Sequence, residues 1–140
     1  MADWKTLKKE IDDELNKKNA TLSQVDLDKL IDFAYSFVTE TDLKFVKIHQ
    51  IRRFFDAVKN IKLSVDSTKD STKSFDKKEK AKLLMLRPQL FNASKKQWTL
   101  KELSNITGEW IKKVNDKDDF YQFANFFESL VAFHKAEAKE

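Results

Sequence analysis

The chain has 140 residues, with one glycine, one proline and no cysteine. Lack of cysteine excludes disulfides and thiolate metal sites. Because β-sheet turns depend on glycine and proline, the composition favours an all-α fold, a compact single-domain bundle of about five to six helices over residues 1–140. No apolar stretch approaches the roughly 20 residues that span a bilayer, and no signal peptide is visible, so we expect a cytoplasmic protein without a membrane partner.

The charge is distributed unevenly along the chain. Residues 1–42 carry a net charge of −4, residues 43–101 carry +11 and residues 102–140 carry −3, which together give the net charge of +4. A basic centre between two acidic flanks favours a polyanionic partner. The competing interpretation is that lysine-rich helices only keep the protein soluble.

Apolar residues at helical spacing predict the first three helices. The first covers residues 4–15. The second follows, with Ser23 as its N-cap, and ends between Thr39 and Asp42. The third covers about 46–63, and its buried stripe includes Phe55, with Phe54 at the margin.

Residues 64–74 contain Ser, Thr, Asp and Lys with a single valine, so they predict a mobile loop that cannot bury enough apolar surface to become ordered. A fourth helix is expected from Phe75 or Asp76 onward. Pro88 removes a helical hydrogen bond and predicts a kink or a new helix start, with Arg87 pushed away from helical dihedral angles.

A fifth segment, capped by Thr99, is predicted to run helically to Val114. Gly108 within it costs about 1 kcal/mol relative to alanine, which close approach of another helix would explain. The last helix begins near 116–119 and carries a wide apolar band, Phe120 to Phe133, typical of a central core helix or an interface.

Residues for catalysis or metal binding are not apparent. The sequence has no glycine-rich phosphate loop and no nucleophile elbow. His49 and His134 lack metal-ligand spacing, and we expect His134 to cap the core and His49 to lie on the surface. The acids Asp116, Asp118 and Asp119 fit a helix N-terminus better than a calcium loop. We therefore expect no metal, no cofactor and no enzymatic activity.

Three segments in order resemble a known family. They are KIHQIRRFFDAV (47–58), LLMLRPQLFNASKKQ (83–97) and FFESLVAFHKA (126–136). Together they are similar to the small subunit of type III-A CRISPR effector (Csm) complexes, over the C-terminal two-thirds of the chain. The small subunit of the type III-B complex matches less well. Asn92 and Phe133 stand where the family has tyrosine, and Lys95 and Lys96 stand where Gly-Arg is common.

This resemblance implies a non-catalytic RNA-binding subunit in antiviral defence. It implies that several copies of the chain lie beside the repeated backbone subunit and line the groove in which guide RNA pairs with target RNA. Target cleavage would belong to the backbone subunit, and further partners would include the large Cas10-type subunit.

Guide pairing would supply sequence specificity, so the protein is expected to contact phosphate and ribose only. We predict two basic ridges. The first contains Lys44, Lys47, Arg52, Arg53 and Lys59, and the second contains Arg87, Lys95 and Lys96. The alternative is a helical protein-interaction adaptor that binds no nucleic acid and uses the Phe120 to Phe133 band as its partner surface.

Overall fold

The computed structural model describes residues 3–67 and 75–137, which form helices joined by short turns. The predicted all-α fold is confirmed. Three of the turns are 3₁₀ helices, η1 (Leu22–Gln24), η2 (Asp42–Phe45) and η3 (Trp98–Leu100). The α-helices of these residues are α1 (Trp4–Leu15), α2 (Leu27–Glu40), α3 (Ile48–Ser67), α4 (Lys77–Leu84), α5 (Leu86–Lys96), α6 (Lys101–Ile111) and α7 (Lys117–Glu137).

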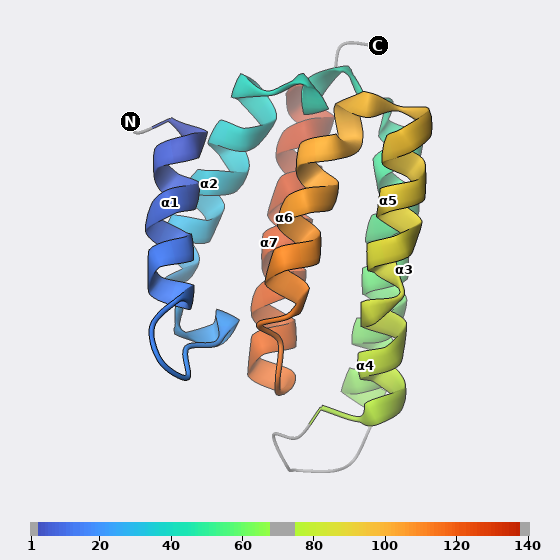
Figure 1. Ribbon diagram of the computed structural model, residues 1–140. Coiled ribbons are helices and arrows are strands. Elements are labelled where there is room, and N and C mark those ends of the chain that lie inside the picture. Colours follow the sequence, from blue (N-terminus) through green and yellow to red (C-terminus); the bar gives the residue numbers. More distant parts are fainter. Residues whose placement is uncertain (1–2, 68–74, 138–140) are drawn as a thin grey trace.

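The helices form two layers (Figure 1). In the view of Figure 1, α1, α6 and the α4–α5 column lie in front, and α2, α7 and α3 lie behind. Helix α7 packs between α2 and α3, and α6 packs against α5. Only Met85 separates α4 from α5, so the two short helices follow one another as a single broken rod.

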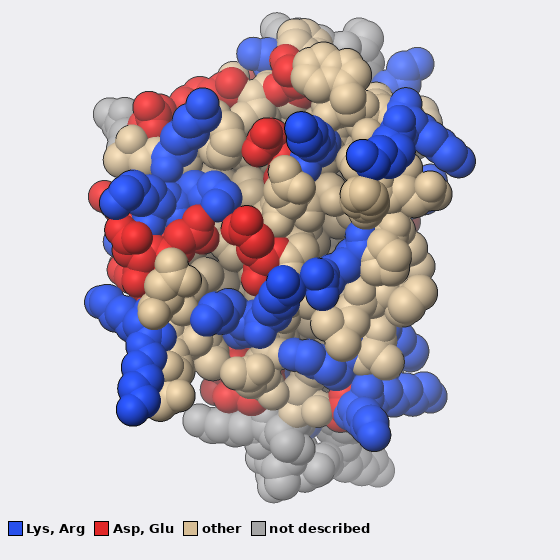
Figure 2. All heavy atoms as spheres, viewed as in Figure 1, with Lys and Arg blue, Asp and Glu red and all other residues tan. Residues whose placement is uncertain are grey.

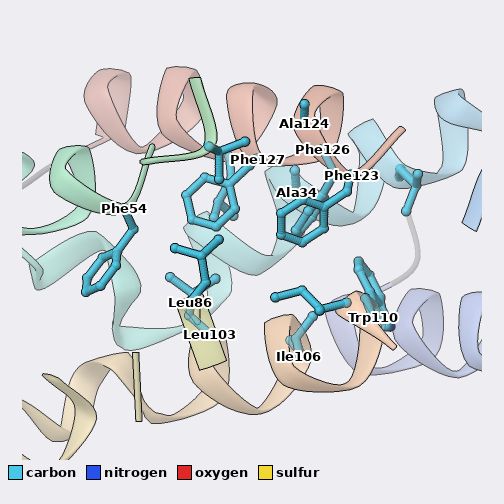
Figure 3. Close-up of a cluster of buried hydrophobic side chains, with 14 of the residues drawn as sticks. Ala34, Phe54, Leu86, Leu103, Ile106, Trp110, Phe123, Ala124, Phe126 and Phe127 are labelled. Atoms are coloured by element: carbon cyan, nitrogen blue, oxygen red, sulfur yellow. The ribbon is translucent and has the colours of Figure 1, made fainter. Parts of the chain in front are cut away.

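The apolar band of α7 forms the centre of the core. Phe120, Phe123, Phe126 and Phe127 are all fully buried. The Phe126 ring lies 5.9 Å from that of Phe33 on α2 and 5.0 Å from that of Trp110 on α6, so it joins both layers. Figure 3 shows Phe126 and Trp110 in a cluster with Leu86 of α5 and with Leu103 and Ile106 of α6.

Burial of this band decides between the two interpretations that the sequence left open. The band is wide because α7 has neighbours on several sides, and it is a core element. The adaptor hypothesis loses the partner surface on which it depended, since Phe133 is itself half-buried against Tyr35.

Two acids cap α7, as the sequence indicated. The backbone N–H of Asp119 donates to Asp116 Oδ1 at 2.9 Å, and the N–H of Asp116 donates to Asp119 Oδ2 at 3.2 Å. Asp119 Oδ2 also accepts from the N–H of Asn115, while Oδ1 accepts from that of Ser23 at 2.8 Å. One buried carboxylate therefore ties η1 to the start of α7.

Two predicted N-caps are wrong. Ser23 lies in η1, and Asp26 caps α2 by accepting from the N–H of Asp28. The N–H of Ser23 serves Asp119 instead, a partner that lies far away in sequence. Thr99 lies within η3 and makes no capping hydrogen bond, and Leu100 occupies the N-cap position of α6.

Helix α3 is longer than predicted and is turned about its axis. Residues 64–67, assigned to the mobile loop, are helical, and 68–74 lie outside the described residues. Tertiary contacts explain the extension: Val65 is buried, Ser64 Oγ donates to Glu79 Oε1 at 2.8 Å, and Tyr121 Oη donates to Asp66 Oδ1.

The buried stripe of α3 contains Phe54 rather than Phe55. Phe54 is 3% exposed, and Phe55 lies at the margin of the core. The sequence placed these two residues the other way round. With two phenylalanines adjacent, a small rotation of the helix decides which of them enters the core.

The predicted new helix start near Pro88 is confirmed, but the predicted effect on Arg87 is wrong. Helix α4 ends at Leu84, and α5 begins at Leu86, so both Arg87 and Pro88 are helical. Pro88 is the third residue of α5, where a backbone N–H has no intrahelical acceptor, so the missing donor is tolerated. The first helical bond runs from Gln89 N–H to the Met85 carbonyl.

The environment of the Asp119 carboxylate leads us to expect that the free energy of unfolding decreases at acidic pH. Burial opposes its ionisation, but the hydrogen bonds from the backbone N–H groups of Asn115 and Ser23 outweigh burial and hold the pKa of Asp119 below its ordinary value of 3.8. Because the pKa of Asp119 is lower in the folded than in the unfolded state, its ionisation stabilises the fold. This stabilisation is complete above the unfolded-state pKa and is lost as pH falls through the folded-state pKa.

We expect Asp119→Asn to lower the free energy of unfolding by about 2 kcal/mol at pH 7, because an amide cannot accept hydrogen bonds on both sides. The difference from the wild type should shrink below about pH 4. Urea unfolding at pH 7 and pH 3 measures both. Asp28→Asn, an exposed acid in the first turn of α2, is the control and should change little. A loss that is equally large at pH 3 would contradict the prediction.

Candidate nucleic-acid interface

Three acids of α1, Asp12, Asp13 and Glu14, form ion pairs with lysines of α1 and α2. Lys8 Nζ lies 2.5 Å from Asp12 and 3.2 Å from Glu109, Lys9 pairs with Asp13, and Lys29 of α2 pairs with Glu14 of α1. By contrast, none of the eight residues predicted to bind RNA forms an ion pair within the described ranges. The positive charge of these eight residues is therefore not cancelled by ion pairs with the acidic flanks among the described residues.

Figure 2 shows the charge on the front face of the molecule. Acidic atoms gather mainly over the α1 and α6 side, where basic atoms accompany them. The α4–α5 side shows basic and uncharged atoms with almost no acidic ones. The sequence segments of opposite net charge thus occupy different parts of this face.

Arg53 of α3 and Lys96 of α5 come together at one pocket. Both side chains are exposed, and both line a pocket of about 200 Å³ between the two helices. The Arg53 guanidinium lies 4.8 Å from the centre of the Phe54 ring, which supports its position. The remaining lining residues are Gln50, Phe54, Asn92, Ala93, Gln97 and Leu100. The two predicted ridges therefore meet here.

Lys59 lies on the opposite flank of α3. It lines a pocket on the α7 side, together with Lys62, Asp66 and Glu128. Arg52, seven residues earlier, shares the direction of Lys59 on the helix and is exposed. Arg52 and Lys59 thus lie on a different flank of α3 from Arg53, although the sequence analysis predicted all three in one ridge.

Lys44 has a structural partner that the sequence did not reveal. In η2 its Nζ donates to the carbonyl of Thr39 at 3.2 Å, near the C-terminal end of α2, and lies 5.5 Å from the Phe45 ring. Cations are favourable at such an end. Lys47 is exposed directly before α3.

Lys80 shows that the number of lysines in the basic centre overstates the positive charge available at the surface. Its Nζ donates to the carbonyl of Val114, which follows α6. Burial lowers the pKa of Lys80, although Asp119 acts against that shift. This lysine belongs to the framework and is not available as a surface cation.

Arg87 lies at a groove between α5 and α6, where it meets a cation that sequence analysis missed. The groove has a volume of about 590 Å³, and Lys112 lines it with Arg87. Lys95, farther along α5, lies over the Phe91 ring at 4.9 Å. Lys112 was overlooked because it belongs to the net-acidic C-terminal segment.

Gly108 lies at this groove, and the reason predicted for it is wrong. No helix backbone approaches it closely. A Cβ built at Gly108 would meet only Arg87 Nε, at an ordinary contact distance of 3.8 Å. The glycine leaves open space between α5 and α6 and is not required by packing.

We therefore expect Gly108→Ala to raise the free energy of unfolding by up to about 1 kcal/mol, the helix-propensity difference between glycine and alanine. Urea unfolding monitored by circular dichroism tests this. Destabilisation would show that the helix interface is tighter than the 3.8 Å contact indicates.

The described residues contain no group of three or more acids and histidines placed to hold a metal ion. His134 is fully buried with Nε2 2.6 Å from the Val46 carbonyl oxygen, which confirms its predicted place at the core, and His49 is exposed. Within the same ranges, no helix has the length and apolar character needed to cross a bilayer.

Comparison with known families identifies the chain. The family model described as Csm2 Type III-A matches residues 24–140. That span includes α2 to α7, the three segments with the resemblance, and all eight predicted RNA-binding residues. Comparisons with curated proteins and with solved structures found no match. Because the family model covers most of the chain, this protein belongs to the Csm2 family, the small subunits of type III-A CRISPR effector complexes.

Proposed function

We propose that this chain is a non-catalytic, RNA-binding small subunit that lines the groove for the guide–target RNA duplex in the cytoplasm during antiviral defence. The observation that carries the proposal is the meeting of Arg53 and Lys96 between α3 and α5, since neither residue has an acidic partner among the described residues. Family membership makes it a component of a Csm complex.

Contacts of this kind are independent of sequence. The guide reads the target by base pairing, so the subunit needs to hold only phosphate and ribose. Arg53 offers a planar fork suited to a phosphate, and Lys96 offers a compact charge beside it. The amides of Gln50, Asn92 and Gln97 at the same pocket add donors for phosphate or ribose oxygens.

The other predicted residues extend this surface in different directions. Arg52 and Lys59 carry positive charge along the α7 side of α3, Lys47 lies before α3, and Arg87 and Lys95 lie on α5. Lys44 contributes least, because its ammonium is already bound to the Thr39 carbonyl. Copies of the chain, the backbone subunit and the Cas10-type large subunit are the proposed protein partners.

Each subunit is expected to bind RNA weakly alone, and several copies assembled along one RNA would bind it more tightly through avidity. If a subunit neutralises about three phosphates, log affinity for a single strand should fall against log salt with a slope of about −2.

The double variant Arg53→Ala/Lys96→Ala tests the proposal. We expect weaker binding to RNA and a salt slope that is shallower by about 1 to 2, because two phosphate contacts are removed. Fluorescence anisotropy over a salt series measures both quantities, with the isolated chain and within a reconstituted complex.

Lys17→Ala/Lys18→Ala is the matched control, since it removes the same charge from two exposed lysines of the first 20 residues that have no acidic partner among the described residues. It should leave the slope nearly unchanged. Equal losses in both double variants would assign the effect to net charge alone and contradict a localised interface. Absence of RNA binding by the wild type, isolated and assembled, would reject the RNA-binding function.

A further inference from the structure

The α5–α6 groove has the features of a second binding site, and Arg87 is the residue of its lining that also belongs to the proposed duplex-binding surface. One wall of the groove is formed by Leu84 at the end of α4 and by Arg87, Pro88 and Phe91 of α5. Helix α6 and the residue after it contribute Ser104, Asn105, Gly108, Glu109 and Lys112. At about 590 Å³ the groove falls in the range of about 300–1,000 Å³ typical of small-molecule sites.

The charge of the groove favours an anion. Its single acid, Glu109, is held by Lys8 of α1 at 3.2 Å. Arg87 and Lys112 have no acidic partner among the described residues. Lys95 adds a third cation, whose Nζ lies over the Phe91 ring at 4.9 Å from its centre. Phosphates on either side of a bound group would therefore meet positive charge.

The apolar part of the groove favours a flat, uncharged group between those phosphates. Phe91 is 51% exposed although it lies in a helix that buries Leu86 and Leu90. Phe91 and Leu84 keep this apolar surface in contact with water. On the opposite wall Gly108 has no side chain to fill the groove, and the neighbouring hydroxyl of Ser104 and amide of Asn105 offer donors and acceptors.

We propose that this groove binds one unpaired RNA nucleobase, stacked on Phe91, with the adjoining phosphates held by Arg87 and Lys112. Stacking on an exposed aromatic ring between cations is how proteins hold single-stranded nucleic acid, and a base inside a duplex cannot use it. The proposal rests on the proposed RNA-binding function and adds to it a second ligand, a base released from the stack.

The test compares two short single-stranded RNAs of equal length and charge, an oligoadenylate and a strand without bases, binding to the full-length protein by fluorescence anisotropy. The wild type should bind the oligoadenylate about fivefold or more tightly than the abasic strand, which corresponds to about 1 kcal/mol. Phe91→Ala should bring that ratio close to one while leaving the affinity for the abasic strand unchanged. Phe91→Tyr should keep the ratio.

Two further variants test whether the base binds in the groove or on any exposed aromatic ring. Gly108→Leu fills the groove from α6 and should also reduce the ratio. Phe45→Ala removes an aromatic ring of similar exposure, 53%, that also has a lysine over it but lies outside the groove, and it should leave the ratio unchanged. Circular dichroism confirms that each variant is folded.

The outcomes distinguish this proposal from the proposed function. Arg53→Ala/Lys96→Ala should weaken both strands and keep the ratio. Equal wild-type affinity for both strands would overturn the nucleobase site, leave the RNA-binding function standing and assign the groove to charge alone, as for an acidic protein segment. Binding of neither strand at low salt, by the isolated chain or the assembled complex, would overturn both.

Discussion

Burial of α7 between two layers is the constraint on which the structure depends. A helix with four fully buried phenylalanines needs neighbours around most of its circumference, and α2, α3 and the front layer supply them. Phe126 touches aromatic rings from both layers. Since the apolar faces of the helices pack into the core, most charged residues lie on the outer faces, and the proposed function depends on how they are arranged there.

The outer faces of the molecule differ in how many of their charged side chains have a partner of opposite charge. Around α1 the acids and lysines pair within a few ångströms, so that region projects little net field. Over α3 and α5 the cations rest on aromatic rings, as with Arg53 on Phe54 and Lys95 on Phe91, and remain without carboxylate partners among the described residues. An aromatic ring positions a cation without neutralising it, so the charge stays available to a polyanion.

The sequence by itself determined the helical class, the approximate helices, the cap of α7 by Asp116 and Asp119, and the new start near Pro88. These features depend on interactions between residues within one or two helical turns, and such interactions are visible as spacing in the sequence. The family resemblance in three ordered segments was also correct.

Only the tertiary structure decided how each helix is turned and which helices lie side by side. It placed Phe54 rather than Phe55 in the core, extended α3 through the contacts of Ser64 and Asp66, and gave the N–H of Ser23 to Asp119. It also brought Lys96 of α5 to Arg53 of α3. The partners in these contacts lie 15 to 96 residues apart along the chain, so no local pattern encodes them.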